Sequence, residues 1–64
     1  MFSLQHIEQA QALFDFIAEE DGEISFKKGD ILFVVEKPDA NWWVGMLGAQ
    51  GSQGLFPSTY VKSL

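Results

Sequence analysis

The sequence contains no cysteine, and none of its apolar runs approaches the roughly 20 residues that a membrane-spanning helix requires. The absence of cysteine excludes disulfides and thiolate metal sites, and it is consistent with a reducing compartment. The first residues carry neither the basic region nor the apolar core of a secretory signal peptide. We therefore expect a soluble domain that does not insert into a membrane.

Basic residues are also scarce. The chain has 4 Lys and Arg against 9 Asp and Glu, and its net charge is −5. Nucleic acid binding requires a basic surface, so this composition argues against a nucleic acid partner. Four acids gather at Glu19, Glu20, Asp21 and Glu23. This cluster either forms a solvated loop or faces a basic partner.

The chain does contain enough apolar material for one small domain. Its 64 residues lie near the lower size at which a core forms without disulfides or metals. Hydrophobic residues make up 47% of the chain, and the aromatic ones include 6 Phe and 2 Trp. This content argues against disorder.

The first half of the chain is divided into short segments that have strand patterns. Residues 12–16 alternate aromatic with small or polar side chains, which is typical of a strand. Residues 17–29 are acidic and rich in turn formers, and they predict a long irregular excursion that Ile24 and Phe26 anchor to a core. Residues 31–35 are continuously apolar and predict a second strand.

The second half continues in the same way. Residues 41–47 predict a strand that carries both tryptophans, residues 48–53 a hairpin connection, and residues 53–56 the partner strand. Pro57 provides no amide donor and fixes its own φ, so we expect one 3₁₀ turn over residues 57–60 before a last strand at 61–64. The whole pattern predicts an all-β fold, a small barrel of five short strands.

The two adjacent tryptophans point to a surface function. Successive side chains of a strand leave on opposite faces, so Trp42 and Trp43 cannot both enter one core. One indole must face outward, either as a binding surface or packed under a loop.

The start of the chain is less informative. Residues 1–11 are compatible with a leader, the tail of an upstream segment, or an entry strand, and we place the domain at residues 10–64 after a leader or linker at 1–9. His6 is the only histidine and has no second ligand type near it. We expect no metal and no cofactor.

Four motifs in one order resemble the Src-homology 3 (SH3) domain. They span roughly residues 10–64 and are Ala12-Leu13-Phe14-Asp15-Phe16, the stretch from Glu23 to Asp30, the pair Trp42-Trp43, and the run from Gly54 to Val61. The resemblance implies a barrel of two packed antiparallel sheets whose acidic excursion and a shorter loop at residues 37–41 flank a ligand groove. The residues that it places in the groove are Phe14, Phe16, Asp21, Glu23, Trp42, Pro57, Thr59 and Tyr60, with Glu20 as a further candidate. Those that it places in the core are Ala12, Ile24, Phe26, Leu32, Val34, Gly45, Phe56 and Val61, with Trp43 covering the other side of the sheet.

The resemblance also implies a function. SH3 domains bind Pro-x-x-Pro segments, which form a stiff polyproline II helix before they bind and so lose little entropy on docking. Phe14 with Tyr60 would form one proline slot, and Trp42 with Pro57 and Tyr60 the next. The acids would select a flanking Arg or Lys and fix the ligand direction. We expect a non-catalytic, monomeric adaptor module of a larger protein in signalling, cytoskeletal or endocytic assembly, located in the cytoplasm, with the cell cortex and cytoskeleton as candidate sites.

Three positions depart from the usual SH3 pattern. Phe14 and Phe16 replace tyrosines, which removes two hydroxyls from the groove. Thr59 stands where an asparagine is most common, and its hydroxyl is a donor that reaches less far toward ligand carbonyls. Gly45 replaces a larger residue and is expected to make room for Phe56.

Other functions are less well supported. Aromatic residues of a small barrel can simply pad its core, and a methyl-lysine cage also combines aromatics with acids. Some SH3 domains bind ubiquitin and carry Phe at the position of Tyr60. The tyrosine in this chain argues against that function. Catalysis is not expected, because the sequence has no nucleophile next to a base, no phosphate-binding glycine loop and no metal-ligand spacing.

Overall fold

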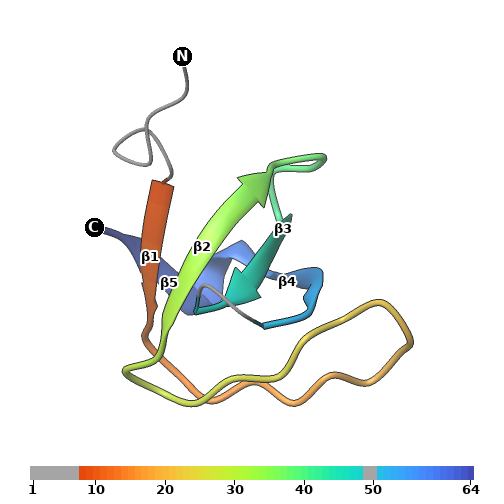
Figure 1. Cartoon of the computed structure of the whole chain (residues 1–64), viewed down its shortest axis with the longest axis horizontal. Helices are drawn as coiled ribbons and strands as arrows, with labels where there is room; N and C mark the ends of the chain where they lie inside the picture. The colour runs from red at the N-terminus through yellow and green to blue at the C-terminus, as the bar shows by residue number, and fades with distance from the viewer. Residues whose placement is uncertain (1–7, 49–50) are drawn as a thin grey trace.

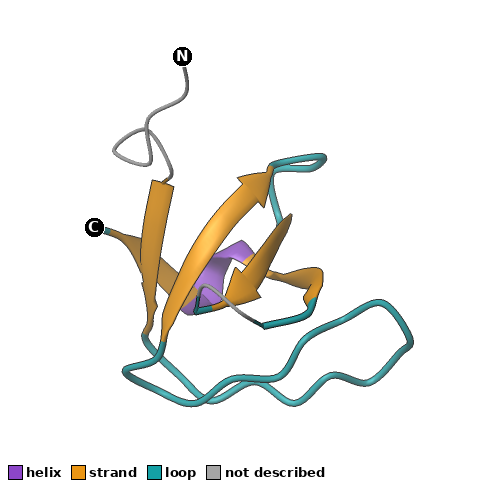
Figure 2. Cartoon of the chain, viewed as in Figure 1, coloured by secondary structure: helices purple, strands orange, loops and turns teal. Residues whose placement is uncertain are grey.

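The computed structural model describes residues 8–48 and 51–64, which form five short strands and one 3₁₀ turn (Figures 1 and 2). The elements are β1 (Glu8–Ala12), β2 (Ile31–Glu36), β3 (Trp42–Leu47), β4 (Gln53–Pro57), η2 (Ser58–Tyr60) and β5 (Val61–Ser63). The predicted all-β class, the five strands and the 3₁₀ turn after Pro57 are confirmed.

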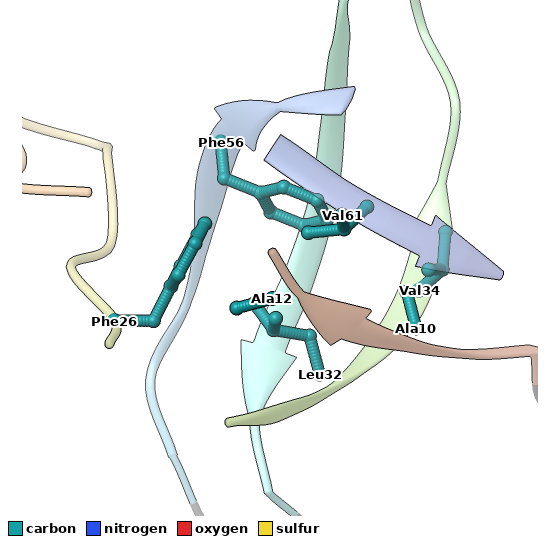
Figure 3. Close-up of a cluster of buried hydrophobic side chains, with 7 residues drawn as sticks. All are labelled: Ala10, Ala12, Phe26, Leu32, Val34, Phe56 and Val61. Atoms are coloured by element: carbon teal, nitrogen blue, oxygen red, sulfur yellow. The ribbon is translucent and has the colours of Figure 1, made fainter. Parts of the chain in front are cut away.

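All five strands belong to one antiparallel sheet with the order β4-β3-β2-β1-β5. The strands at the two ends of the sheet supply side chains to the same core, Phe56 from β4 and Val61 from β5 (Figure 3). The sheet must therefore curve on itself. The predicted two packed layers are therefore two parts of one hydrogen-bonded sheet.

Alternation along the strands selects the core. Ala10 and Ala12 of β1 and Leu32 and Val34 of β2 are buried, whereas the residues between them are not, as expected for strands with one face toward a core. The buried hydrophobic residues are Ala10, Ala12, Phe26, Leu32, Val34, Phe56 and Val61. Of the predicted core, Ile24 is only partly buried and packs against this cluster, and Ala10 is an addition to it.

Gly45 is buried in β3, as predicted, and the reason lies in its neighbours. A Cβ at this position would lie 2.8 Å from Cε2 of Phe56 and 2.5 Å from the carbonyl oxygen of Phe33. Gly45 therefore makes room for the Phe56 ring, which is fully buried.

The first strand differs from the prediction. We expected it at residues 12–16, but β1 ends at Ala12, and Phe16 forms only an isolated antiparallel bridge with Phe26. The pairing partners explain the difference, since β2 begins at Ile31 opposite Gln11 and β5 begins at Val61 opposite Ala12. The entry strand therefore begins by Glu8, two residues inside the predicted leader. Residues 1–7, with His6, and residues 49–50 of the predicted hairpin connection lie outside the described residues.

The connection from β1 to β2, residues 13–30, is the longest loop in the fold and extends away from the barrel (Figure 1). We call it the RT loop. Its tip and its end each contain a turn closed by a backbone bond, from Glu23 N–H to the Glu20 carbonyl and from Asp30 N–H to the Lys27 carbonyl. Gly22 and Gly29 take the third positions of these turns with φ of 92° and 93°, a conformation that glycine adopts without steric cost.

Candidate functional site

Four aromatic rings from three separate segments follow one another across the surface. The ring centroids of Phe14 and Tyr60 are 5.7 Å apart, those of Tyr60 and Phe16 also 5.7 Å, and those of Phe16 and Trp42 6.2 Å. All three contacts are edge to face, the geometry that the ring quadrupoles favour. We call these four residues the aromatic row.

Backbone hydrogen bonds hold the three segments of the aromatic row in place. Leu13 N–H donates to the Tyr60 carbonyl at 2.7 Å, which fixes the start of the RT loop beside η2. Phe16 and Phe26 exchange both of their backbone hydrogen bonds at 2.9 Å. The row is therefore set by the fold and not by the rings alone.

The η2 turn is also tied to the loop that precedes Trp42. Ser58 N–H donates to the Asn41 carbonyl at 2.9 Å, and the Ser58 hydroxyl donates to the Ala40 carbonyl at 2.7 Å. In the β3–β4 pair, Trp42 lies opposite Pro57. The loop at residues 37–41 and the Pro57 turn thus form one unit next to the Trp42 indole. This role of Ser58 was not predicted from the sequence, although a serine after Pro57 is a turn-forming residue.

Exposure varies along the predicted groove. Phe14 and Trp42, the ends of the aromatic row, are 57% and 37% exposed. Phe16 and Tyr60 are half-buried, Thr59 is exposed and Pro57 is buried. The Phe16 ring contacts the rings of both Trp42 and Tyr60. Phe16 is therefore more central to the row than the sequence indicated.

The predicted acids lie on the RT loop, which is bonded to the edge of the sheet. Leu55 N–H donates to the Gly22 carbonyl at 2.7 Å, and Ile24 N–H donates to the Leu55 carbonyl at 3.0 Å. Gly54 permits this approach, because a Cβ there would lie 2.7 Å from Cγ2 of Ile24 and 2.8 Å from the Gly22 oxygen. The loop segment that carries Glu23 is therefore fixed against β4.

The individual acids differ in how they are held. One oxygen of Glu23, Oε1, accepts a hydrogen bond from Glu19 N–H at 2.9 Å, so the carboxylate is oriented and its second oxygen has no part in that bond. Asp21 and Glu20 are exposed in the turn at the loop tip. Of the three acids considered for the groove, Glu23 is thus oriented by a hydrogen bond, and Glu20 and Asp21 are exposed.

Trp43 leaves β3 on the face opposite Trp42, as predicted, but it does not lie over an outer surface. Its ring packs edge to face with the buried Phe56 at 6.5 Å, and the Lys37 ammonium lies 4.3 Å from its ring centroid. Register explains the position, because Trp43 is directly opposite Phe56 in the β3–β4 pair and both side chains leave the same face. Trp43 closes one side of the core.

Among residues 8–48 and 51–64, no three His, Cys, Asp or Glu side chains are grouped so that they could hold a metal ion. The same residues include no helix of the length and apolarity needed to cross a membrane.

Comparison with known proteins identifies the family. The sequence model described as SH3 domain matches residues 11–58, and the chain belongs to the SH3 domain family. SH3 domains are generally non-catalytic modules that bind peptides. The fold agrees: the C-terminal SH3 domain of myosin IB from Entamoeba histolytica, solved with a bound peptide named EhFP10(GEF), aligns with a TM-score of 0.82 and 41% identity over 91% of this chain and 83% of that one.

Two curated relatives are similar over nearly the whole chain. The class E vacuolar protein-sorting machinery protein HSE1 of Pyricularia oryzae is 45% identical over 91% of this chain and 8% of its own length. Endophilin-A2 of Gallus gallus is 44% identical over 97% of this chain and 17% of its own length. The chain therefore spans less than a fifth of each of these relatives.

Proposed function

We propose that the chain binds proline-rich segments in the polyproline II conformation across the aromatic row. The row is the observation that supports this most directly. One turn of a polyproline II helix covers about 9 Å, and the rings of the row follow one another at centroid spacings of 5.7 Å and 6.2 Å, so the row offers successive apolar surfaces to such a ligand. Prolines three residues apart can therefore rest in successive slots, the first beside Phe14 and Tyr60 and the second beside Trp42.

Polar groups around the row would orient the ligand. The Trp42 indole N–H, the Tyr60 hydroxyl and the Thr59 hydroxyl are donors that can reach ligand carbonyls. Phe14 and Phe16 offer only apolar surface. The full proposed site consists of Phe14, Phe16, Asp21, Glu23, Trp42, Pro57, Thr59 and Tyr60.

The acids of the RT loop are proposed to select a flanking Arg or Lys. Glu23 supports this role best, because the bond from Glu19 N–H orients its carboxylate before a ligand arrives. A guanidinium can donate hydrogen bonds to such an oriented carboxylate and stack on the Trp42 ring. Exposed ion pairs contribute only about 0–1 kcal/mol, so the acids would set specificity and direction more than affinity.

The family and the similar proteins support a proposal for the wider role. We propose a non-catalytic, monomeric adaptor domain within a longer cytoplasmic protein, acting in signalling, cytoskeletal or endocytic assembly at the cell cortex or cytoskeleton. A myosin and a vacuolar protein-sorting protein among the similar proteins support this range of roles. The predicted domain at residues 10–64 is extended to include Glu8 and Gln9, which belong to β1.

Titration of a Pro-x-x-Pro peptide with a flanking Arg, followed by tryptophan fluorescence or NMR, tests the groove. We expect weak, reversible binding, and Trp42→Ala should weaken it roughly tenfold or more, because aromatic anchors dominate small interfaces. Val35→Ala is the matched control, since Val35 is also an exposed large hydrophobic residue, 46% exposed. Unchanged binding by Trp42→Ala would refute the groove assignment.

A second pair of titrations tests the acids. Glu23→Gln keeps an acceptor for Glu19 N–H but removes the charge, so we expect it to weaken Arg-flanked peptides and leave proline-only peptides unchanged. Added salt should have the same selective effect. Glu36→Gln is the control for a general loss of negative charge. Equal losses for both peptides would refute the selection of a basic flank.

A further inference from the structure

A hollow lies at the base of the RT loop, where this loop meets the end of β3. Its volume is about 350 Å³, and its lining residues are Asp15, Phe16, Ile17, Ser25, Phe26, Lys27, Asp30 and Leu47. Phe16 is the only residue that the hollow shares with the aromatic row. The hollow is therefore a separate surface feature that the proposed groove does not use.

The apolar part of the lining is unusually open to solvent. Ile17 is 77% exposed and Leu47 is 38% exposed, whereas Phe26 beside them is buried. Ligand pockets usually have volumes of about 300–1,000 Å³, so this hollow is at the small end of that range. It has room for one large side chain and exposes apolar surface that such a side chain would cover.

The charged residues in the lining indicate which residues of a ligand should flank that side chain. Oδ1 of Asp15 accepts a hydrogen bond from Lys28 N–H at 2.8 Å, and Oδ2 of Asp30 accepts one from Lys27 N–H at 2.9 Å. These bonds orient both carboxylates and use one oxygen of each. The lining thus carries two oriented carboxylates against the single ammonium of Lys27, in a chain whose net charge is −5.

We propose that this hollow is a second docking site, for a protein segment that places one bulky aliphatic or aromatic side chain between Ile17 and Leu47 and pairs neighbouring Lys or Arg with Asp15 and Asp30. Proline is not required, because the hollow lacks the row of spaced rings that separates proline slots. The proposal does not depend on the function proposed for the aromatic row.

An array of proline-free octapeptides tests the proposal. One set has Leu, Ile, Met, Phe or Trp at the centre between Lys and Arg residues, a second has the same centres between Glu residues, and a third has a Ser centre between Lys and Arg. The probe is the whole chain and its Trp42→Ala variant. We expect the first set alone to bind, equally to both proteins, and its best member to shift the NMR signals of Ile17 and Leu47.

Variants of the hollow complete the test. Ile17→Ser and Leu47→Ser should each weaken the best peptide several-fold, and so should Asp15→Asn, which keeps an acceptor for Lys28 N–H. The matched controls should bind normally: Val35→Ser for an exposed aliphatic side chain, and Asp39→Asn for a carboxylate that accepts a backbone N–H, here that of Asn41 at 2.8 Å. Circular dichroism verifies that each variant is folded, and Ile17, being mostly exposed, can be replaced without loss of the core.

Three results would overturn the proposal. The first is no binding above the Ser-centred set, and the second is equal loss in the control variants, which would indicate only general attraction to an acidic chain. The third is binding that disappears in Trp42→Ala, which would assign the peptides to the aromatic row.

Discussion

At Gly45, the space around a single backbone position determines which residue is allowed. In an open strand position alanine is more stable than glycine by roughly 0.5–1 kcal/mol. Here, however, a Cβ would meet the Phe33 oxygen at 2.5 Å and Phe56 Cε2 at 2.8 Å. We therefore expect Gly45→Ala to lower the free energy of unfolding by about 1–3 kcal/mol, the usual cost of overpacking.

Urea denaturation measures this change. Ser52→Ala serves as the control, because Ser52 is exposed and its replacement should change stability by less than about 0.5 kcal/mol. If Gly45→Ala were neutral or stabilising, the close contacts with Phe33 and Phe56 would not limit this position.

The burial of a residue could be predicted well where the residue belongs to a sequence motif or to a regular hydrophobic pattern. The core positions Leu32, Val34 and Phe56 are buried as expected. Ala10 was missed because a small side chain in a polar stretch gives no hydrophobic period, although it is completely buried. The central position of Phe16 in the aromatic row could not be predicted either, since it depends on how the RT loop bends over η2.

Among the elements, the RT loop depends on its contact with β4. A Cβ at Gly54 would lie 2.7 Å from Cγ2 of Ile24 and 2.8 Å from the Gly22 oxygen, so we expect Gly54→Ala to push this part of the loop away from the strand. The amide hydrogens of Ile24 and Leu55, which form the contact, should then exchange faster with solvent.

Hydrogen exchange followed by NMR checks this expectation within one sample. The amides of Phe16 and Phe26, which pair with each other at the base of the same loop, provide the internal reference and should stay protected. Unchanged protection at Ile24 and Leu55 would show that the loop tolerates a side chain at Gly54.

A second link between elements joins β1, β5 and the residue after β2. Oε1 of Glu8 lies 2.8 Å from Nζ of Lys37, and Oε2 accepts a hydrogen bond from the Ser63 hydroxyl at 3.0 Å. The hydrogen bond from Lys37 lowers the pKa of Glu8 below its ordinary value near 4.5; the Ser63 bond and the Lys37 charge act in the same direction, and partial desolvation opposes them. The link is therefore present when Glu8 is ionised.

Stability should follow the ionisation of Glu8. Because the folded pKa is the lower one, the stabilisation is complete above the ordinary pKa and is lost as the pH falls through the folded pKa. We expect Glu8→Gln to be less stable than the parent chain at neutral pH, by at most about 1 kcal/mol for such an exposed pair, and equally stable once the pH is low enough to protonate Glu8 in the folded chain. Urea denaturation at both pH values measures the difference, with Glu36→Gln as control; a constant difference at all pH values would contradict it.

The limits of the elements were harder to predict than their existence. The last four strands and the 3₁₀ turn follow from apolar patterns and from turn residues such as Pro57, whereas the first strand was expected at residues 12–16 and lies at Glu8–Ala12. The exact start of β1 does not follow from such patterns, because it is decided by pairing with β2 and β5, which are distant in sequence. Phe14 and Phe16 alternate like strand residues, yet they face the aromatic row.

For the molecule as a whole, charge is the most unusual property. With a net charge of −5 the folded chain repels itself, and added salt screens this repulsion over about 10 Å at 0.1 M. We expect sodium chloride to raise the midpoint of thermal unfolding at neutral pH. The same salt should have little effect near pH 4.4, the isoelectric point. A midpoint that falls with salt at neutral pH would mean that local pairs such as Lys37 with Glu8 outweigh the overall repulsion.

The attachment of the RT loop to β4 also affects how the protein behaves in a crowded solution. β4 is an edge of the sheet, and exposed edges can pair with other chains and seed aggregates. Both backbone groups of Leu55 are instead bonded to the loop, so the loop that carries the acids also covers the edge. A substitution that releases it would therefore impair recognition and solubility together, and this double role restricts how freely the loop sequence can change.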